Sequence, residues 1–146
     1  MKCLSVKQPW ASLIMAGLKE YETRGWETNY RGLVSIHASR AFGYEAQSLC
    51  DQEPFKTALK KAGISRVDMP RGVLLGTIEL FEVIPTARMN TTELSPEERA
   101  FGDFRVGRFA WRFRKPQLLA KPVPMTGRLG IFELPDSLVY VDRRLS

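Results

Sequence analysis

The sequence predicts an α+β fold that is mostly β, a small mixed β-barrel with two to three short helices beside it. The chain has 146 residues, enough for one domain with its own core, so we expect a single domain over residues 1–146. Five or so segments read as strands, and the helical segments do not alternate regularly with them. Because a parallel α/β sheet needs that alternation, a mixed or antiparallel sheet fits better.

The strand-like segments are defined by alternation of apolar residues and by their boundaries. A turn at Arg31–Gly32 precedes a strand whose apolar face holds Val34 and Ile36. The longest candidate is rich in Val, Leu and Ile and ends at Pro85. The predicted strands are 2–6, 33–39, 71–85, 108–114 and 130–134.

Three segments carry helix signals. After Pro9, apolar residues recur at helical spacing until Gly17, which ends the helix. Residues 43–63 are helical with a break near Pro54. A third helix begins at Ser95, which is followed by proline and two acidic residues.

Composition narrows the class of protein. The net charge of +6 and the pI of about 9.6 favour anionic partners, nucleic acid first, although a basic surface that only aids solubility explains them equally well. The two cysteines, Cys3 and Cys50, form no CxxC pair and there is one histidine, so we expect no metal site and no cofactor. The start lacks a signal-peptide core, and no stretch approaches the ~20 apolar residues of a membrane span. We expect a cytoplasmic protein without a membrane partner.

A dense charged stretch, "GLKEYETRGW" at 17–26, is the first candidate site. In an extended chain Glu20, Glu22 and Arg24 point the same way. A lysine such as Lys19 can keep a nearby carboxylate ionised or can act as a base when burial lowers its pKa, and arginine offers a planar fork for phosphate or a base edge. On charge alone a solvated edge strand is the better interpretation, because surface ion pairs contribute little.

Two further segments hold candidate ligand-binding residues. Gln8 could read a base edge and Trp10 could stack on a base, but Trp10 is better explained, taken alone, as a core residue. His37 could serve as a general base or a polar contact in a cleft, although a lone histidine on a half-polar strand is more often structural. Ser39 and Arg40 follow it and add a hydroxyl and a phosphate-type donor.

The segment "FGDFRVGRFAWRFRK" at 101–115 interleaves arginines with aromatic residues, a mixture that suits single-stranded nucleic acid. Alternation would instead turn Phe109, Trp111 and Phe113 toward the core and leave the arginines as a solvated outer face. Both interpretations stay open. The sequence has no P-loop, GxGxxG, GxSxG or HExxH motif, which argues against a nucleoside triphosphatase, a dinucleotide enzyme and a serine hydrolase.

Taken in order, these motifs resemble the ASCH domain family of the PUA-like superfamily, from Cys3 to Leu134. The later segments "FGDFRVGRFAW" and "GRLGIFEL" resemble the closing half of that domain. The residues that carry the resemblance are Gln8-Pro9-Trp10, Gly17-x-Lys19-x-x-Glu22-x-Arg24, Arg31-Gly32 and His37-Ala38-Ser39.

The resemblance implies a small β-barrel with helices at its side and a cleft lined by the GxKxxExR motif, in a family mostly regarded as binding RNA or other nucleic acid. One group of small relatives removes the acetyl group from N4-acetylcytidine with a Lys–Thr–Glu site, and its nucleophilic threonine matches Glu22 here. Glutamate is a poor substitute for that hydroxyl but could act as a general base for water. Some members have been proposed to cleave RNA, a role for which Lys19 and His37 are the candidates.

We therefore expect a domain that binds RNA, another single-stranded nucleic acid or a nucleotide. Lys19 and Arg24 would contact phosphate or a base edge, and Glu22 would orient Lys19 or accept a hydrogen bond from an exocyclic amine. The alternatives are a hydrolase of a modified nucleoside with Lys19 and Glu22 as its catalytic pair, and a protein-interaction module whose cleft has lost its function. The other expected ligand-binding residues are Gln8, Trp10, His37, Ser39, Arg40 and Arg108.

Overall fold

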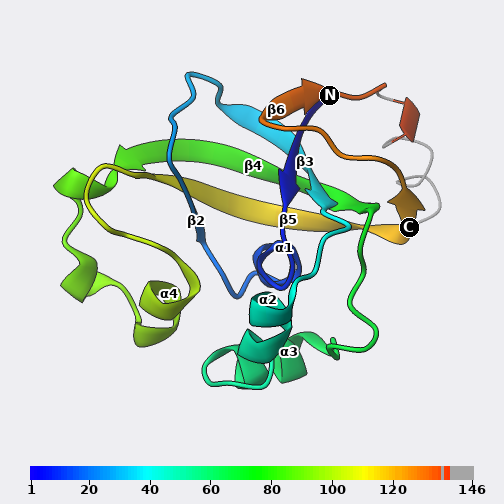
Figure 1. Ribbon diagram of the computed structural model, residues 1–146. Coiled ribbons are helices and arrows are strands. Elements are labelled where there is room, and N and C mark those ends of the chain that lie inside the picture. The colour runs from blue at the N-terminus through cyan, green and yellow to red at the C-terminus, as the bar shows by residue number, and fades with distance from the viewer. Residues whose placement is uncertain (136, 139–146) are drawn as a thin grey trace.

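A computed structural model describes residues 1–135 and 137–138 (Figure 1). Within this part of the chain no helix is long and apolar enough to cross a membrane. The strands are β1 (Lys2–Val6), β2 (Tyr21–Arg24), β3 (Gly32–Ala38), β4 (Val73–Pro85), β5 (Phe109–Pro124) and β6 (Ile131–Glu133). The helices are α1 (Trp10–Met15), α2 (Tyr44–Leu49), α3 (Phe55–Ala62), α4 (Pro96–Phe101) and two 3₁₀ turns, η1 (Thr86–Arg88) and η2 (Thr91–Glu93).

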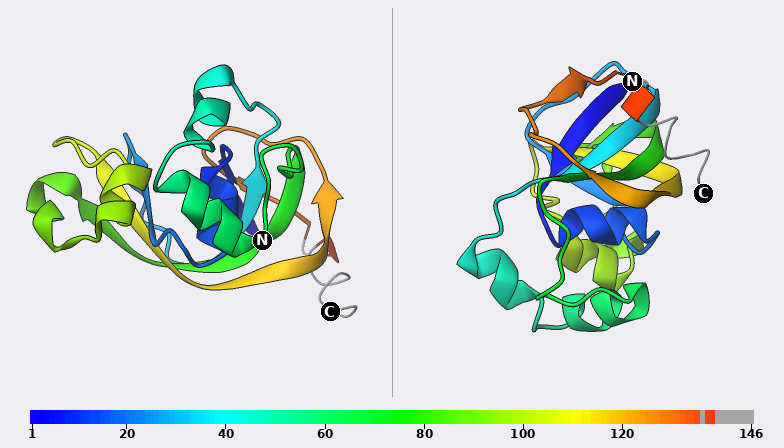
Figure 2. Two further views of the ribbon diagram at one scale, coloured as in Figure 1. Left: turned by 90° about the horizontal axis from the view of Figure 1, so that it is seen from below. Right: turned by 90° about the vertical axis from the view of Figure 1, so that its right-hand side faces the viewer.

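The strands form one mixed sheet in the order β2-β5-β4-β3-β1-β6. β1 and β3 run parallel, and the other neighbouring pairs are antiparallel. The long strands β4 and β5 curve across the molecule, and the four α-helices gather on one side of the sheet (Figures 1 and 2). The expectation of a mixed sheet with short flanking helices is confirmed.

The closed barrel is not confirmed. Among the described residues the sheet is open, with β2 and β6 at its edges. A barrel would require backbone pairing between edge strands, which needs a matching tilt and stagger of all strands. Here a side chain reaches from the β2 edge to β1 instead: Arg24 Nη2 donates to the Ser5 carbonyl at 2.8 Å.

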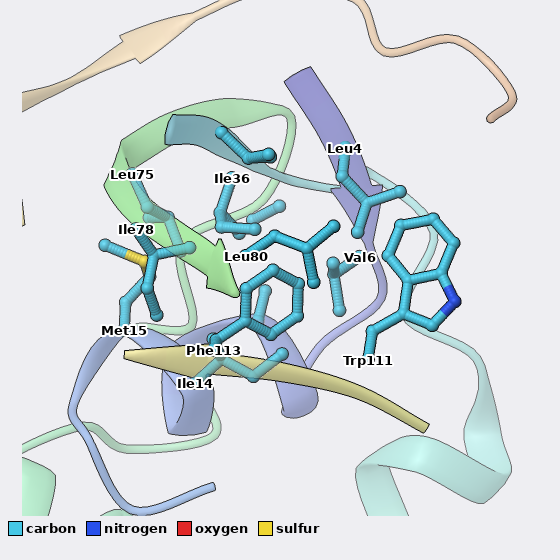
Figure 3. Packing of buried hydrophobic residues seen from close by; sticks show 13 residues of the cluster. Leu4, Val6, Ile14, Met15, Ile36, Leu75, Ile78, Leu80, Trp111 and Phe113 are labelled. Atoms are coloured by element: carbon cyan, nitrogen blue, oxygen red, sulfur yellow. The ribbon is translucent and has the colours of Figure 1, made fainter. Parts of the chain in front are cut away.

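The main core lies between the sheet and α1 (Figure 3). Alternation along β5 buries Trp111 and Phe113, which pack in one cluster with Ile14 of α1 and Leu80 of β4. The Trp111 indole nitrogen donates to the Trp26 carbonyl at 3.2 Å, so its polar group is satisfied. The aromatic residues of β5 thus belong to the core, as one of the two interpretations of this segment required.

The arginines of β5 are neutralised on the opposite face of the strand. Arg112 Nε lies 2.6 Å from Glu20 Oε1, and Arg114 Nε lies 2.8 Å from Glu79 Oε2. The Phe81 ring lies under both guanidinium groups, at 5.2 Å from Arg112 and 4.3 Å from Arg114. Because glutamates already neutralise these arginines, we interpret them as a solvated outer face of the sheet and not as a binding surface for phosphates.

At Gly76, β4 lies too close to β5 for a side chain, and we expect Gly76→Ala to lower the free energy of unfolding by about 1–3 kcal/mol. A Cβ atom there would overlap the Gln117 carbonyl oxygen and lie 2.9 Å from Leu118 Cα. Both are backbone atoms of a paired strand, so they cannot rotate away. Urea unfolding followed by circular dichroism measures the loss. Gly43→Ala is the matched control, because nothing lies within 4 Å of its Cβ position; equal midpoints for the two variants would contradict the account.

Candidate nucleic-acid site

A cavity of about 530 Å³ opens where β1, β2 and α1 meet the loops that precede β5 and β6. Clefts of this size commonly hold small ligands. Among the described residues that line it, cations outnumber carboxylates. The cations are Lys7, Arg24, Arg108 and Arg128, and the carboxylates are Glu22 and Asp103.

Two residues of the charged motif reach this cavity from β2. Gly17 ends α1 in the left-handed conformation, with φ of 76°, and the chain then turns into β2. Glu22 Oε2 lies 3.0 Å from Arg24 Nη2, and that nitrogen also donates to the Ser5 carbonyl. Arg24 Nε is buried and has no hydrogen-bond partner in the described part of the chain. The guanidinium is therefore fixed in place but retains donor capacity.

Lys19 lies one layer behind the cavity wall. Its side chain is fully buried, with Nζ 3.5 Å from the Phe101 carbonyl oxygen and 4.0 Å from Glu22 Oε1. Burial lowers the pKa of Lys19, and the charges of Glu22 and Glu98 act in the opposite direction. The geometry gives Lys19 a supporting position next to Glu22, not direct access to a ligand.

Glu98 completes this buried layer from α4. Its carboxylate accepts hydrogen bonds from the backbone nitrogens of Glu20 at 2.6 Å and Tyr21 at 3.4 Å. Burial raises the pKa of Glu98, while these hydrogen bonds and Lys19 lower it. The side chain thereby ties α4 to the start of β2.

The two candidates at the start of α1, Gln8 and Trp10, lie in different places. Gln8 is fully buried: its Oε1 accepts from the Ser12 nitrogen at 3.0 Å, and its Nε2 donates to Ser12 Oγ and to the Pro70 carbonyl. Its amide therefore fastens the start of α1 and does not line the cavity. Trp10 is half-buried and does line it, with its ring edge-to-face against Phe55 at 6.1 Å.

Arg108 also lines the cavity and is held by hydrogen bonds to two backbone carbonyls. Its Nε donates to the Asp103 carbonyl at 3.1 Å, and its Nη2 donates to the Thr23 carbonyl at 3.2 Å. Hydrogen bonds from Arg105, aided by the charges of Arg105 and Arg108, lower the pKa of Asp103 to about 2. Arg108 thus fastens the loop before β5 to β2, and the Asp103 carboxylate pairs with Arg105 and Arg108 within that loop.

Because the pKa of Asp103 is depressed from 3.8 to about 2 in the folded state, its contribution to stability is present above pH 3.8 and is lost as the pH falls toward 2. We expect Asp103→Asn to be less stable than the parent at pH 7 and closer to it at pH 2. Thermal unfolding of both proteins between pH 7 and pH 2 measures this difference. A stability difference that is the same at every pH would contradict it.

Three of the expected residues, His37, Ser39 and Arg40, line a second cavity of about 730 Å³, and Ser39 lines both. His37 Nε2 lies 2.9 Å from the Met125 carbonyl and Nδ1 lies 2.9 Å from Ser5 Oγ. A carbonyl only accepts, so Nε2 carries the proton, and in the neutral ring the Ser5 hydroxyl donates to Nδ1. The ring is fully used in these contacts, and it shares no cavity with Lys19.

Most of the chain matches one known family. A family model of the ASCH domain matches residues 4–116. The chain belongs to the ASCH domain family. Residues 17–24 fall inside the matched range, so the charged motif is part of the domain.

Curated relatives of this ASCH domain include human and mouse proteins called Activating signal cointegrator 1. The human protein is 30% identical over 139 residues and the mouse protein 31% identical over 140 residues. Each alignment covers 94% of this chain and 23% of the relative, so the chain spans about a quarter of their length.

Solved structures similar to this ASCH domain come from Zymomonas mobilis. The crystal structure of ASCH from that organism has a TM-score of 0.55 at 13% identity and covers 93% of this chain and 88% of its own. A serine-to-alanine mutant of the same Zymomonas protein has a TM-score of 0.57 at 14% identity and covers 96% of this chain and 94% of its own. Similarity at this identity establishes the fold.

Several lining residues of the ASCH domain were not among the residues predicted from sequence. Lys7 precedes the Gln8-Pro9-Trp10 motif and Thr23 lies inside the charged motif, so both could have been found from their position. Arg128 lies outside residues 4–116 and lines both cavities. The one local signal is that Arg128 lies between Gly127 and Gly130, because glycines mark a loop and a loop exposes a cationic side chain to solvent.

Proposed function

We propose that this ASCH domain binds RNA, and that the cavity beside β2 takes one nucleotide of a single-stranded segment. The observation that carries the proposal is the gathering of four cationic side chains and the half-buried Trp10 around one cavity of about 530 Å³. Cations neutralise phosphates, and an aromatic face stacks on an unpaired base. Single-stranded rather than duplex nucleic acid fits a concave site of this size.

The two arginines on the cavity walls are preorganised for this role. Arg24 is held by the Ser5 carbonyl and Arg108 by the carbonyls of Thr23 and Asp103. Side chains that are already ordered lose less entropy on binding, and their planar forks match phosphate or a base edge. Glu22 adds an acceptor for an exocyclic base amine.

Fluorescence anisotropy with a labelled single-stranded RNA of about ten nucleotides, at about 50 and 200 mM salt, tests the proposal. If about three phosphates are contacted, affinity should fall roughly tenfold or more between the two salt concentrations. A hairpin of the same composition should bind more weakly. Absence of binding at the lower salt concentration would overturn the proposal.

A second candidate is hydrolysis of a modified nucleoside such as an acylated cytidine. It is favoured by the buried Lys19 lying 4.0 Å from the carboxylate of Glu22, which lines the cavity. Glu22 would act as general base for a water molecule, with Lys19 beside it as electrostatic partner. Incubation with N4-acetylcytidine, followed by chromatography, should then release cytidine and acetate, and Glu22→Gln should abolish release. No turnover by the parent protein rejects this candidate.

A ribonuclease-like activity is tested in the same binding mixtures. Lys19 and His37, the pair expected for it, do not share a cavity, and His37 is held by Ser5 and Met125. Intact RNA after prolonged incubation rejects the activity. Cleavage that disappears in His37→Ala supports it.

A further inference from the structure

We propose that the second cavity, of about 730 Å³, is an anion site that binds the phosphate next to the nucleotide held in the first cavity. The preferred ligand is then a phosphorylated nucleotide or an oligonucleotide rather than a nucleoside. The identity of this ligand rests on the proposed function, whereas the anion site itself rests on the cavity described below.

The charges around the second cavity differ in kind from those around the first. The described residues that line it include two guanidinium groups, Arg40 and Arg128, and no carboxylate. The first cavity, in contrast, is lined by Glu22 and Asp103 as well as by cations. A mixed-charge cavity suits a base with donors and acceptors, and a purely cationic one suits an anion.

Within the described residues the two arginines are also unpaired, unlike those of the sheet face. Within residues 1–135 the side chains of Arg40 and Arg128 form no ion pair and no hydrogen bond. Arg112 and Arg114, in contrast, are both paired with glutamates. Like charges around one cavity repel each other, and a bound phosphate would relieve this repulsion.

Arg40 is positioned by the backbone next to it. Gly72 has φ of 64°, and a Cβ atom there would lie 3.4 Å from Arg40 Nε, so the arginine side chain lies directly across the glycine. The hydroxyl groups of Ser39 and Thr126 line the same cavity without hydrogen-bond partners among the described residues. Phosphate oxygens accept from both donor types.

The loop that carries Arg128, between β5 and β6 (orange in Figure 1), is anchored beside this cavity. The Met125 nitrogen donates to the Gly72 carbonyl at 3.0 Å, and the Met125 carbonyl accepts from His37. Gly127 then passes so close to Ser5 and His37 that a Cβ atom would overlap both. The backbone leading into Arg128 is thus held in place.

The two cavities are neighbours with a shared wall. Ser5, Ser39, Arg128 and Leu129 line both of them. A nucleotide with its base near Trp10 and Glu22 can therefore extend its phosphate past Arg128 to Arg40. This geometry assigns the base, with the contacts of Arg24 and Arg108, to the first cavity and the adjacent phosphate to the second.

The test compares binding of cytidine with binding of its 5′- and 3′-monophosphates by titration calorimetry, using the parent protein, Arg40→Gln and Arg114→Gln. Arg114 is the matched control, since it loses the same charge on the outer face of the sheet, where it is paired with Glu79. We expect at least one monophosphate to bind about tenfold more tightly than cytidine. Arg40→Gln should remove that gain and leave cytidine unchanged, and Arg114→Gln should change neither.

The failure of this inference is distinguishable from the failure of the proposed function. RNA binding that depends on Arg24 but not on Arg40 overturns the anion site and leaves the proposed function standing. If no nucleotide or RNA binds, inorganic pyrophosphate is the remaining probe. An Arg40-dependent rise of the melting temperature with pyrophosphate would retain the anion site and reject its role in nucleotide binding, whereas no rise would overturn the site as well.

Discussion

Replacing Arg24 with alanine is expected to weaken binding of single-stranded RNA by about ten- to a hundredfold, because one well-placed phosphate or base contact contributes roughly 1–3 kcal/mol. Arg24 lines the cavity, is held by the Ser5 carbonyl and Glu22, and keeps a buried Nε without a partner in the described residues. The variant also leaves the Glu22 carboxylate facing the cavity without its neighbouring cation, and the unpaired carboxylate repels phosphate. Anisotropy titrations at low salt measure the change.

Two further variants separate a specific contact from a loss of net charge. Arg114→Ala removes the same charge from the outer face of the sheet, where Glu79 pairs with it, and should weaken binding by less than about threefold. Arg24→Lys keeps the charge but loses the planar fork, and should fall between the parent and Arg24→Ala. Equal losses in Arg24→Ala and Arg114→Ala would show that binding follows charge alone. Melting temperatures of all variants are compared first, because Arg24 also bridges β2 and β1.

Replacing Lys19 with alanine is expected to lower the free energy of unfolding by about 3–5 kcal/mol, the usual result of removing one partner from a buried charged group. Burial lowers the pKa of Lys19, whereas the carboxylates of Glu22 and Glu98 raise it and so favour the charged form of the lysine. The loss arises because the buried Glu98 keeps its hydrogen bonds to the start of β2 but loses the nearby cation. Urea unfolding measures the effect.

A double substitution tests this explanation. Lys19→Met/Glu98→Gln removes both charges while keeping side-chain volume, and should recover part of the stability lost in Lys19→Met alone. Lys60→Ala, an exposed lysine in the last turn of α3, serves as the control and should change stability by less than about 1 kcal/mol. A Lys19→Ala protein as stable as the Lys60→Ala protein would mean that Lys19 has no structural role.

The fold was largely predictable because its strands carry a strong local signal. Alternation located β3 and the start of β5, and a run of Val, Leu and Ile ending at Pro85 located β4. One of the two interpretations left open for β5 placed Trp111 and Phe113 in the core, where the structure has them. Closure into a barrel was not predictable in the same way. It depends on the stagger between distant strands, and in this sheet the Arg24 side chain, not a strand pairing, crosses from β2 to β1.

Only part of the role of the charged motif could be predicted from its own sequence. Glu22 and Arg24 do line the cavity, but Lys19, three residues before Glu22, is fully buried behind it. A pattern of charges in one segment does not state which of them other elements will cover, and here α4 supplies that cover through Phe101 and Glu98.

The pairing of the β5 arginines with glutamates of β4 could not be predicted from either strand alone. Their pairing depends on the register that places Glu79 opposite Arg114 and Glu82 opposite Arg112. Such pairs lie 30 and 35 residues apart in sequence, so neither segment reveals them alone. Arg128 was missed for a related reason: only the folded loop brings it to the wall between the two cavities.

Photo-crosslinking tests the central claim, RNA binding in the cavity beside β2, most directly. The protein is irradiated with single-stranded RNA containing 4-thiouridine, and the attached residues are mapped by mass spectrometry. We predict crosslinks at Trp10 and in the segments that line the two cavities, 22–24, 100–103 and 124–130. Crosslinks confined to the outer face of β4 and β5, around Phe81 and Arg114, would contradict the account.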